Sequence, residues 1–266
     1  MKIVNFKSGL GNQFFYYLMY LYLQQRFPNE KVYGYYNSKF LQKHNGLELQ
    51  NLLDITMPPV SRISNMTAFL CRFLSKVIKK LKADDITFSD EAIYYDGWWQ
   101  DKKYYLGHEK QLCFRHLELD ANNCSTLELI QNTNSVSLHV RRGDYLDADN
   151  VKVYGGICTL DYYKKAVNII SQRMDNPHYF VFSNDIEWAK ENIKLPLVTY
   201  VSDNDGIKSH LDLYLMSHCK ANILANSSFS YWAAMMNEHP EKLVICPQIW
   251  NHNETPDIFP REWIRI

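Results

Sequence analysis

Two adjacent arginines make the sharpest chemical feature of this sequence. Arg141 and Arg142 belong to the segment His139-Val140-Arg141-Arg142-Gly143-Asp144-Tyr145, which ends a β-rich run, Val136–Arg141. Alternation along a strand puts His139 and Arg141 on the same face. Guanidinium groups are planar and bind phosphate oxygens in pairs, which suits arginine better than lysine for this purpose. The segment therefore predicts a site for a diphosphate, with a structural salt bridge between Arg142 and Asp144 as the alternative.

Polar residues also follow two other β-rich runs. The run 222–225 leads into a helix that starts with Asn226-Ser227-Ser228-Phe229, and backbone amides at a helix start bind anions. The run 178–183 ends in Ser183-Asn184-Asp185. Asp185 could accept hydrogen bonds from the amino group of a nucleobase or cap the next helix. Both junctions are candidate ligand sites, and a plain helix cap is the alternative for each.

A glycine-containing loop, Lys7-Ser8-Gly9-Leu10-Gly11-Asn12-Gln13, follows the first predicted strand. Gly9 and Gly11 would let the backbone approach a ligand, but the rest of a dinucleotide-binding fingerprint is missing. No Gly-Lys-Ser/Thr follows, so the loop is not a Walker phosphate loop. The loop is a candidate site mainly through its position after a strand.

Strands and helices alternate through the C-terminal half, which predicts a parallel sheet with right-handed crossovers. The predicted strands are 136–141, 178–183, 197–202, 222–225 and 243–246, and the predicted helices are 161–174, 186–193, 208–219 and 227–238. Such sheets bind ligands at the carboxyl ends of their strands. The arginine segment and both polar junctions lie at such ends.

The N-terminal part begins in the same way, with a predicted strand 2–6, a helix 12–27 and a strand 31–35. Irregular structure is expected over 36–60, where turn-forming residues gather. The polar stretch 120–135 has little apolar periodicity, which is typical of a link between domains. We therefore predict two lobes, residues 1–130 and 131–266.

Four blocks, in this order, resemble the inverting fucosyltransferases, and most closely the α-1,2-fucosyltransferases of glycosyltransferase family 11. The matching blocks are Gly9–Phe14, His139–Tyr145, Ser183–Asp185 and Ala225–Ala234. The resemblance implies an α/β, GT-B-like fold of two Rossmann-type lobes with parallel sheets and a cleft between them. The N-terminal lobe would face the acceptor, and the C-terminal lobe would bind GDP-β-L-fucose. The implied enzyme is a galactoside α-1,2-fucosyltransferase of carbohydrate biosynthesis, as in bacterial O-antigen assembly, which fucosylates the 2-hydroxyl of a terminal galactose.

The resemblance also implies roles for single residues. Arg141 would bind the β-phosphate, His139 and Asp185 would hold the nucleoside, and Asn12 would lie near the fucose and the acceptor. Asp212 resembles a family position near the guanine and ribose. The other donor-binding candidates are Gly9, Gly11, Gln13, Arg142, Ser183, Asn184, Asn226, Ser227, Ser228 and Phe229.

The expected chemistry requires no metal and no other cofactor. Arginines and helix-terminal amides would stabilise the negative charge that grows on the leaving GDP. Inversion requires the acceptor hydroxyl to attack from the face opposite GDP with the help of a base. Asp144 is the first candidate for that base because it is the acid nearest to the arginines in sequence, although it could instead orient Arg142.

Two other functions remain open at this stage. Asp147-Ala148-Asp149 and Asp203-Asn204-Asp205 match the Asp-x-Asp pattern of metal-dependent GT-A transferases, although such acids are also common in turns. The second alternative is a non-catalytic protein that binds a nucleotide sugar or a carbohydrate, with aromatic residues such as Trp98-Trp99 stacking on the sugar. The paired arginines argue against a lectin for neutral sugars.

Composition excludes several classes of protein. The 266 residues carry 29 basic and 29 acidic side chains, so no overall field attracts nucleic acid. The six cysteines show no C-x-x-C spacing, which argues against a zinc or redox site. No apolar run approaches the roughly 20 residues of a membrane span. The N-terminus lacks the pattern of a signal peptide, so a cytoplasmic enzyme is expected.

Residues 62–82 predict a basic amphipathic helix. Ile63, Met66 and Phe73 recur at helical spacing among several cations, and the segment contains no acid. The favoured interpretation is a helix packed through its apolar face. The alternative is a helix lying on the inner face of a membrane, where the acceptor glycan could be carried on a lipid instead of being a free oligosaccharide.

Overall fold

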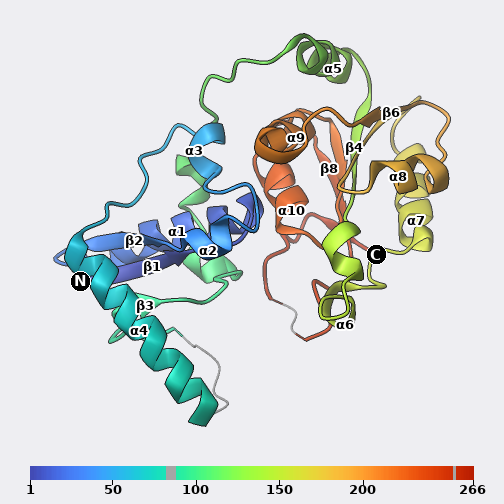
Figure 1. The fold of residues 1–266 in the computed structure, drawn as a ribbon. Coiled ribbons are helices and arrows are strands. Elements are labelled where there is room, and N and C mark those ends of the chain that lie inside the picture. Colours follow the sequence, from blue (N-terminus) through green and yellow to red (C-terminus); the bar gives the residue numbers. More distant parts are fainter. Residues whose placement is uncertain (82–87, 254–255) are drawn as a thin grey trace. The chain divides into compact units, whose positions relative to one another are not determined.

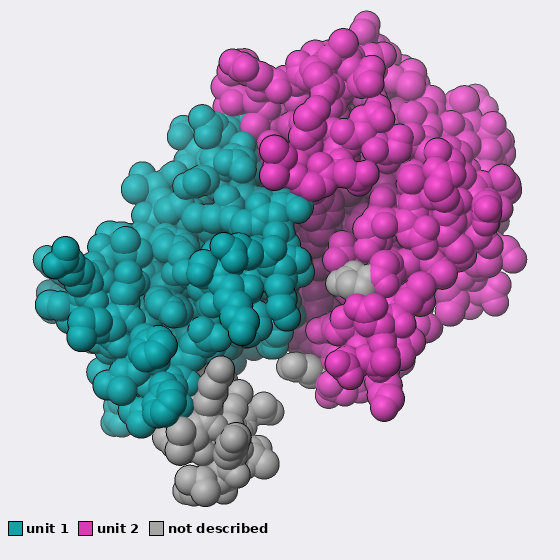
Figure 2. Space-filling model, in the orientation of Figure 1, with its two compact units in different colours: residues 1–115 teal, residues 116–266 magenta. Residues whose placement is uncertain are grey.

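Parallel strands joined by helices build both halves of the chain (Figure 1). The computed structural model describes residues 1–81, 88–253 and 256–266, except for the side chains of 76–81 and 144. The chain divides into a first unit, Met1–Arg115, and a second unit, His116–Ile266, shown in teal and magenta in Figure 2. The predicted boundary at 130/131 lies 15 residues further along the chain.

The first unit contains a three-stranded parallel sheet in the order β2-β1-β3. Its elements are β1 (Lys2–Phe6), α1 (Leu10–Arg26), β2 (Val32–Tyr36), α2 (Ser38–Leu41), α3 (Leu49–Leu52), α4 (Arg62–Leu81) and β3 (Tyr94–Tyr95). The apolar side chains of β1 and α1 are buried and form the core of this unit. Only two short helices interrupt the irregular structure predicted over 36–60.

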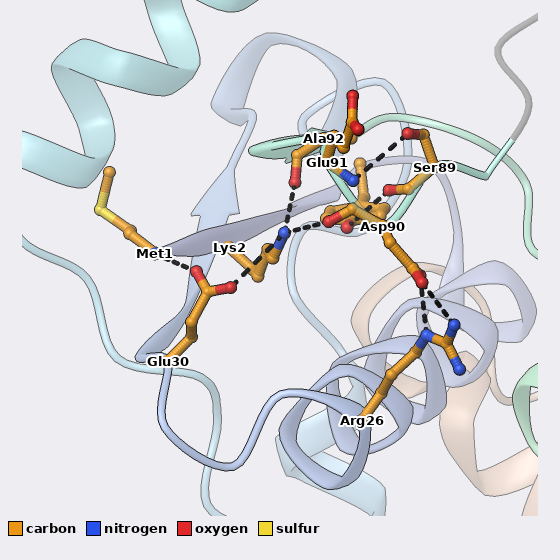
Figure 3. Close-up of polar contacts among 9 residues, drawn as sticks. Met1, Lys2, Arg26, Glu30, Ser89, Asp90, Glu91 and Ala92 are labelled. Atoms are coloured by element: carbon orange, nitrogen blue, oxygen red, sulfur yellow. Dashed lines mark hydrogen bonds and ion pairs between the residues drawn. The ribbon is translucent and has the colours of Figure 1, made fainter.

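Polar contacts at the start of β1 fix the chain that leads into β3 (Figure 3). The Lys2 ammonium group donates to the backbone carbonyls of Asp90 and Ala92. Arg26, in the last turn of α1, forms a two-pronged ion pair with the Asp90 carboxylate, and the amino group of Met1 pairs with Glu30. These contacts hold β3 beside β1.

The second unit contains six parallel strands in the order β6-β5-β4-β7-β8-β9. The strands are β4 (Ser135–Val140), β5 (His178–Ser183), β6 (Val198–Val201), β7 (Ala221–Ile223), β8 (Leu243–Cys246) and β9 (Ile264–Arg265). The helices are α5 (Ala121–Asn132), α6 (Val151–Tyr154), α7 (Leu160–Ser171), α8 (Ile186–Asn192), α9 (Ser209–Ser217) and α10 (Ser228–Met235). Helices α7 and α8 lie to one side of the sheet, and α9 and α10 lie to the other (Figure 1).

The alternation predicted for β4 is confirmed. Val136, Leu138 and Val140 belong to the apolar core that α7 and α8 help to form. Ser137 lies on the other face, where its hydroxyl accepts a hydrogen bond of 2.7 Å from Asn222 of β7. The sequence did not predict the short edge strands β3 and β9, because two residues are too few to show an alternating pattern.

The predicted link over 120–135 is wrong, because most of it forms helix α5. Asp120 caps this helix by accepting a hydrogen bond of 3.0 Å from the backbone N–H of Asn123. Asn123 and Ile130 are buried, and α5 packs on α9 and β4. The segment is polar because most of α5 is exposed, and this left too few apolar residues to reveal the helix.

The interpretation of α4 as a helix packed through its apolar face is also wrong. The small residues Ser64 and Ala68 are buried, and the helix packs on β2 and β1. The large apolar side chains point away from this contact, and Met66 is 73% exposed. The others that are exposed are Ile63, Phe69, Leu70, Phe73 and Leu74. Residue 82 of the predicted helix lies outside the described residues.

Candidate active site

The carboxyl edge of the sheet in the second unit carries three of the blocks found in the sequence. From β4 the chain passes through β5 to β6, then returns to β7 on the other side of β4. Doubly wound sheets bind ligands outside the carboxyl ends of the strands at such a reversal. Val140 pairs with Ser183, and Leu138 pairs with Ile223. The blocks that follow β4, β5 and β7 therefore emerge at the same edge.

Arg142 is held by the residues that follow β5. Its backbone N–H donates to Asn184 Oδ1 at 3.0 Å, and its Nε donates to Asp185 Oδ2 at 3.3 Å. Its guanidinium carbon lies 4.0 Å from the ring centre of Trp188, a residue that the sequence analysis missed. Asp185 also caps α8. Asp144, the partner suggested for Arg142 by the sequence, has a side chain that lies outside the described residues.

Gly143 is required by the close approach of Asn184. A Cβ atom at position 143 would lie 2.3 Å from Asn184 Nδ2. A larger residue would therefore displace the amide that orients the backbone of Arg142. Gly143 therefore leaves the space in which the Asn184 amide, from the block after β5, contacts the block after β4.

His139 is buried against α10. Its side chain is 4% exposed, and its ring centre lies 5.6 Å from that of Phe229. Burial, and then the nearby charge of Arg141, lower the pKa of His139 to about 3. Its Nδ1 has no hydrogen-bond partner among the residues that the structure describes. The imidazole is therefore neutral at pH 7, which suits it to hydrogen bonding and not to proton transfer.

Tyr145 joins the block after β4 to the block after β7. Its hydroxyl donates to the backbone carbonyl of Asn226 at 2.9 Å, and its ring stacks on Tyr154 with centres 4.8 Å apart. The guanidinium carbon of Arg141, a half-buried residue, lies 5.8 Å from the Tyr145 ring centre. The sequence analysis gave Tyr145 no role of its own, although it ends the arginine segment.

The residues after β7 begin helix α10. Ser227 caps the helix by accepting a hydrogen bond of 3.4 Å from the backbone N–H of Phe229. Asn226 donates to the carbonyls of Tyr154 and Trp250 at 3.2 and 3.3 Å. Ser228 lies in the first turn and is half-buried. The cap places the positive end of the α10 dipole at the sheet edge that also carries the arginines.

Asp212, on α9, belongs to a different hydrogen-bond cluster. Its Oδ1 accepts from Asn204 Nδ2 at 2.8 Å, and Asn204 in turn exchanges hydrogen bonds with Asn123. Burial raises the pKa of Asp212 to about 7, with Asp205 and Asp203 adding to the effect and the Asn204 hydrogen bond opposing it. The family resemblance implied a place for Asp212 near the guanine and ribose. A pKa of about 7 means that about half of the Asp212 carboxyls are protonated at pH 7, and the protonated form can donate as well as accept a hydrogen bond.

The two Asp-x-Asp motifs form no shared cluster in the described part of the chain. Asp203 accepts a hydrogen bond of 3.2 Å from Asn122, and Asp205 precedes a short 3-10 helix, Gly206–Lys208. Within the described residues, 1–81, 88–253 and 256–266, no group of three or more His, Cys, Asp or Glu side chains could hold a metal ion. Both motifs lie in or beside turns, as their composition suggested.

The glycine loop lies in the first unit, where Gly9 precedes helix α1. Gln13 is buried and uses its whole amide: Nε2 donates to the carbonyls of Ser8 and Gly46, and Oε1 accepts from the N–H groups of Glu48 and Leu49. These contacts assign Gln13 to holding the loops in place. Asn12 is half-buried and contacts Ser8 and Gln100 at 3.0 and 2.9 Å.

The first unit also has a pocket of about 380 Å³ at the carboxyl ends of its strands. Its lining comes from the ends of β1, β2 and β3 and from α2 and α4; these residues are Asn5, Lys7, Ser8, Asn37, Phe40, Lys43, His44, Arg72, Ser75, Asp96 and Trp98. Lys7 pairs with Asp96 at 2.8 Å and lies 4.8 Å from a ring centre of Trp98. The sequence analysis named Trp98 only as one of many aromatic residues.

Comparison with known proteins identifies the family. The model of "Glycosyl transferase family 11" matches residues 3–266. The chain belongs to glycosyl transferase family 11. It is 31% identical to an alpha-1,2-colitosyltransferase of Escherichia coli over 99% of this chain and 98% of that protein. It is 33% identical to the human galactoside alpha-(1,2)-fucosyltransferase 1 over 38% of this chain and 28% of that protein.

The fold of this family 11 glycosyltransferase is also found in a solved structure. NodZ alpha-1,6-fucosyltransferase soaked with GDP-fucose superposes with a TM-score of 0.52, covering 88% of this chain and 91% of NodZ at 13% sequence identity. The α/β architecture with parallel sheets in two units is GT-B-like, as the resemblance implied. No helix in the described residues is long and apolar enough to span a membrane.

Proposed function

We propose that this family 11 enzyme transfers L-fucose from GDP-β-L-fucose, with inversion, to the 2-hydroxyl of a terminal galactose. The observation that carries the proposal is the reversal point of the second sheet, where Tyr145 joins the segment that carries Arg141 and Arg142 to Asn226, just before α10. The second unit would bind GDP, and the first would face the acceptor. The name of the human relative supports a galactoside as the acceptor and an α-1,2 linkage in the product.

The two arginines explain how the reaction would proceed without a metal. Breaking the bond between fucose and phosphate leaves negative charge on GDP, and fixed cations stabilise that charge most in the transition state. Arg142 is held by Asp185 and Asn184, so little reorganisation is needed when the charge develops. Asp144 remains the proposed base for the acceptor hydroxyl.

The test is release of GDP from GDP-fucose with lactose as acceptor, in the presence of EDTA. Turnover under these conditions supports metal-free fucosyl transfer. Activity that is lost in EDTA and restored by manganese would support the metal-dependent alternative. Binding of GDP-fucose without transfer to lactose or to a panel of other β-galactosides would support a sensor.

The donor sugar is the second point to test, because the relative that matches over the whole chain transfers colitose. Colitose is L-fucose without its 3-hydroxyl group. We expect a higher kcat/KM with GDP-fucose than with GDP-colitose at equal concentrations. A higher kcat/KM with GDP-colitose would make colitose the proposed donor sugar and leave the proposed type of reaction unchanged.

We also propose that the enzyme contacts an anionic membrane surface through α4. This helix packs through small residues and presents six large apolar side chains outward. Its sequence has five cations and no acid, so identical helices of two copies would repel each other, whereas anionic lipids would attract them. The apolar face and the basic charge together match the surface of an anionic bilayer.

Vesicle sedimentation tests this contact. The enzyme should sediment with vesicles of phosphatidylglycerol and phosphatidylcholine but much less with phosphatidylcholine alone. Phe69→Ser with Phe73→Ser should abolish binding. Leu106→Ser with Ile207→Ser removes apolar groups that are even more exposed but lie outside α4, and it should leave binding unchanged. A dimer that the first pair of substitutions dissociates would overturn the proposal in favour of a second copy.

A further inference from the structure

The pocket of the first unit is lined by residues with buried polar atoms that form no hydrogen bond in the described part of the chain. Asn5 and Asn37 are 1% and 4% exposed, and both line the pocket. Asn5 Oδ1 and Asn37 Nδ2 are buried and have no hydrogen-bond partner in the part of the chain that the structure describes. A buried amide that lacks a partner costs free energy. A hydroxyl group both donates and accepts hydrogen bonds, so sugar hydroxyls could satisfy an acceptor and a donor of this kind.

The wall of the pocket adds aromatic surface. Trp98 and Phe40 line it, and both are exposed. Aromatic rings pack against the apolar face of a sugar ring, while polar groups around them fix its hydroxyls. Asp96 contributes a carboxylate that is already held by Lys7 and by Asn5 Nδ2, at 2.8 and 2.6 Å. The pocket therefore combines the two kinds of contact that carbohydrates use.

Two further cations distinguish this pocket from a site for a neutral sugar. These cations are Arg72 of α4 and Lys43, which follows α2, and both line the pocket. The guanidinium carbon of Arg72 lies 5.2 Å from the ring centre of Phe40, and the ammonium nitrogen of Lys43 lies 5.8 Å from it. Neither forms an ion pair with a carboxylate among the described residues. Lys7, by contrast, is neutralised by Asp96. Two cations without an acidic partner favour an anionic ligand, and the guanidinium group in particular suits a phosphate.

We propose that this pocket binds a sugar bearing a phosphate, as the part of the acceptor glycan that is joined to a lipid. The proposal rests on the proposed fucosyl transfer and narrows its acceptor. Arg72 and Ser75 of α4 line the pocket, so the helix with the outward apolar face also forms the wall of the sugar site. With α4 on a bilayer, as proposed above, the phosphate that joins a glycan to a lipid would lie close to this helix.

The test compares lactose, lactose 1-phosphate and the same phosphate esterified to a short prenyl chain as acceptors. We expect lactose 1-phosphate to have a KM about tenfold below that of lactose, as one additional charged contact implies. A further gain with the prenyl ester, seen only with anionic vesicles, assigns the phosphate to a lipid-linked source. Equal KM values for all three acceptors overturn the proposal.

Matched variants locate the effect. Arg72→Gln with Lys43→Gln should abolish the preference for phosphate, so that the KM values for lactose 1-phosphate and lactose become equal when both are measured in the double variant. Lys39→Gln removes one charge from α2 outside the pocket and should leave the preference for phosphate unchanged. An unchanged preference for phosphate in the double variant would place the anion elsewhere.

Direct binding separates failure of this proposal from failure of the proposed reaction. Calorimetry with lactose 1-phosphate, without donor, should show binding to the wild type and its loss in the double variant. If GDP-fucose is neither bound nor consumed but lactose 1-phosphate binds, the reaction is wrong and the pocket assignment stands. If fucose is transferred but calorimetry shows no binding of lactose 1-phosphate, the pocket assignment is wrong.

Discussion

The carboxyl edges of the two sheets differ in how far their polar side chains are already paired. In the second unit, Arg142 is held by Asn184 and Asp185, and Tyr145 is fixed to Asn226, although His139 Nδ1 has no partner in the described residues. In the first unit, the buried amide atoms Asn5 Oδ1 and Asn37 Nδ2 have no hydrogen-bond partner in the described residues, and Arg72 and Lys43 form no ion pair there. Paired groups are preorganised for a ligand of fixed shape, whereas unpaired groups gain their partners only when a ligand binds. We therefore expect the proposed donor site to be more rigid than the proposed acceptor site, which would gain hydrogen bonds and ion pairs from its ligand.

The largest effect should come from the charge at the rigid edge. Arg141→Ala should lower kcat/KM for GDP-fucose by about a hundredfold or more, because it removes the cation that we propose stabilises the leaving diphosphate. Arg173→Ala, an exposed arginine at the end of α7, is the matched control and should change little. Steady-state GDP release measures both. Equal losses in the two variants would remove Arg141 from the donor site.

A second prediction concerns the protonation of Asp212. Its pKa of about 7 in the folded chain lies above the ordinary value of 3.8. Between these values the folded state holds a proton that the unfolded state has lost, so stability should fall as pH rises from about 4 to 7, by about 1 kcal/mol per pH unit. Asp212→Asn should remove this slope. Urea unfolding at several pH values provides the measurement, and parallel slopes in both proteins would contradict the assignment.

The smallest effect should come from the contact between Gly143 and Asn184. Gly143→Ala should displace the Asn184 amide and free the backbone of Arg142, which we expect to raise the KM for GDP-fucose about fivefold, equivalent to one lost hydrogen bond. Asn184→Ala should have the same effect. If the glycine acts through this amide, the double variant should be no worse than either single variant. Additive losses would show separate roles.

The sequence predicted the second unit far better than the first. Strands β5 and β8 have the predicted bounds, and β4, β6 and β7 differ from their predicted ranges by one or two residues. Strands β4, β5, β7 and β8 are largely buried and bounded by turn-forming or capping residues, so their apolar runs are distinct. In the first unit, β1 matches, but the two-residue strand β3 and the short helices α2 and α3 carry too little pattern to be detected.

By itself, the sequence determined the alternation of strands and helices, the polar blocks at strand ends and the amphipathic spacing of α4. These depend on local periodicity and capping, which neighbouring residues specify. Only the tertiary structure decided that Arg142 pairs with Asp185, that 121–132 is a helix packed on α9, and that the small face of α4, not the large apolar one, meets the sheet. Periodicity shows which side chains share a face. It does not show what lies opposite, because that partner comes from a segment far away in the chain.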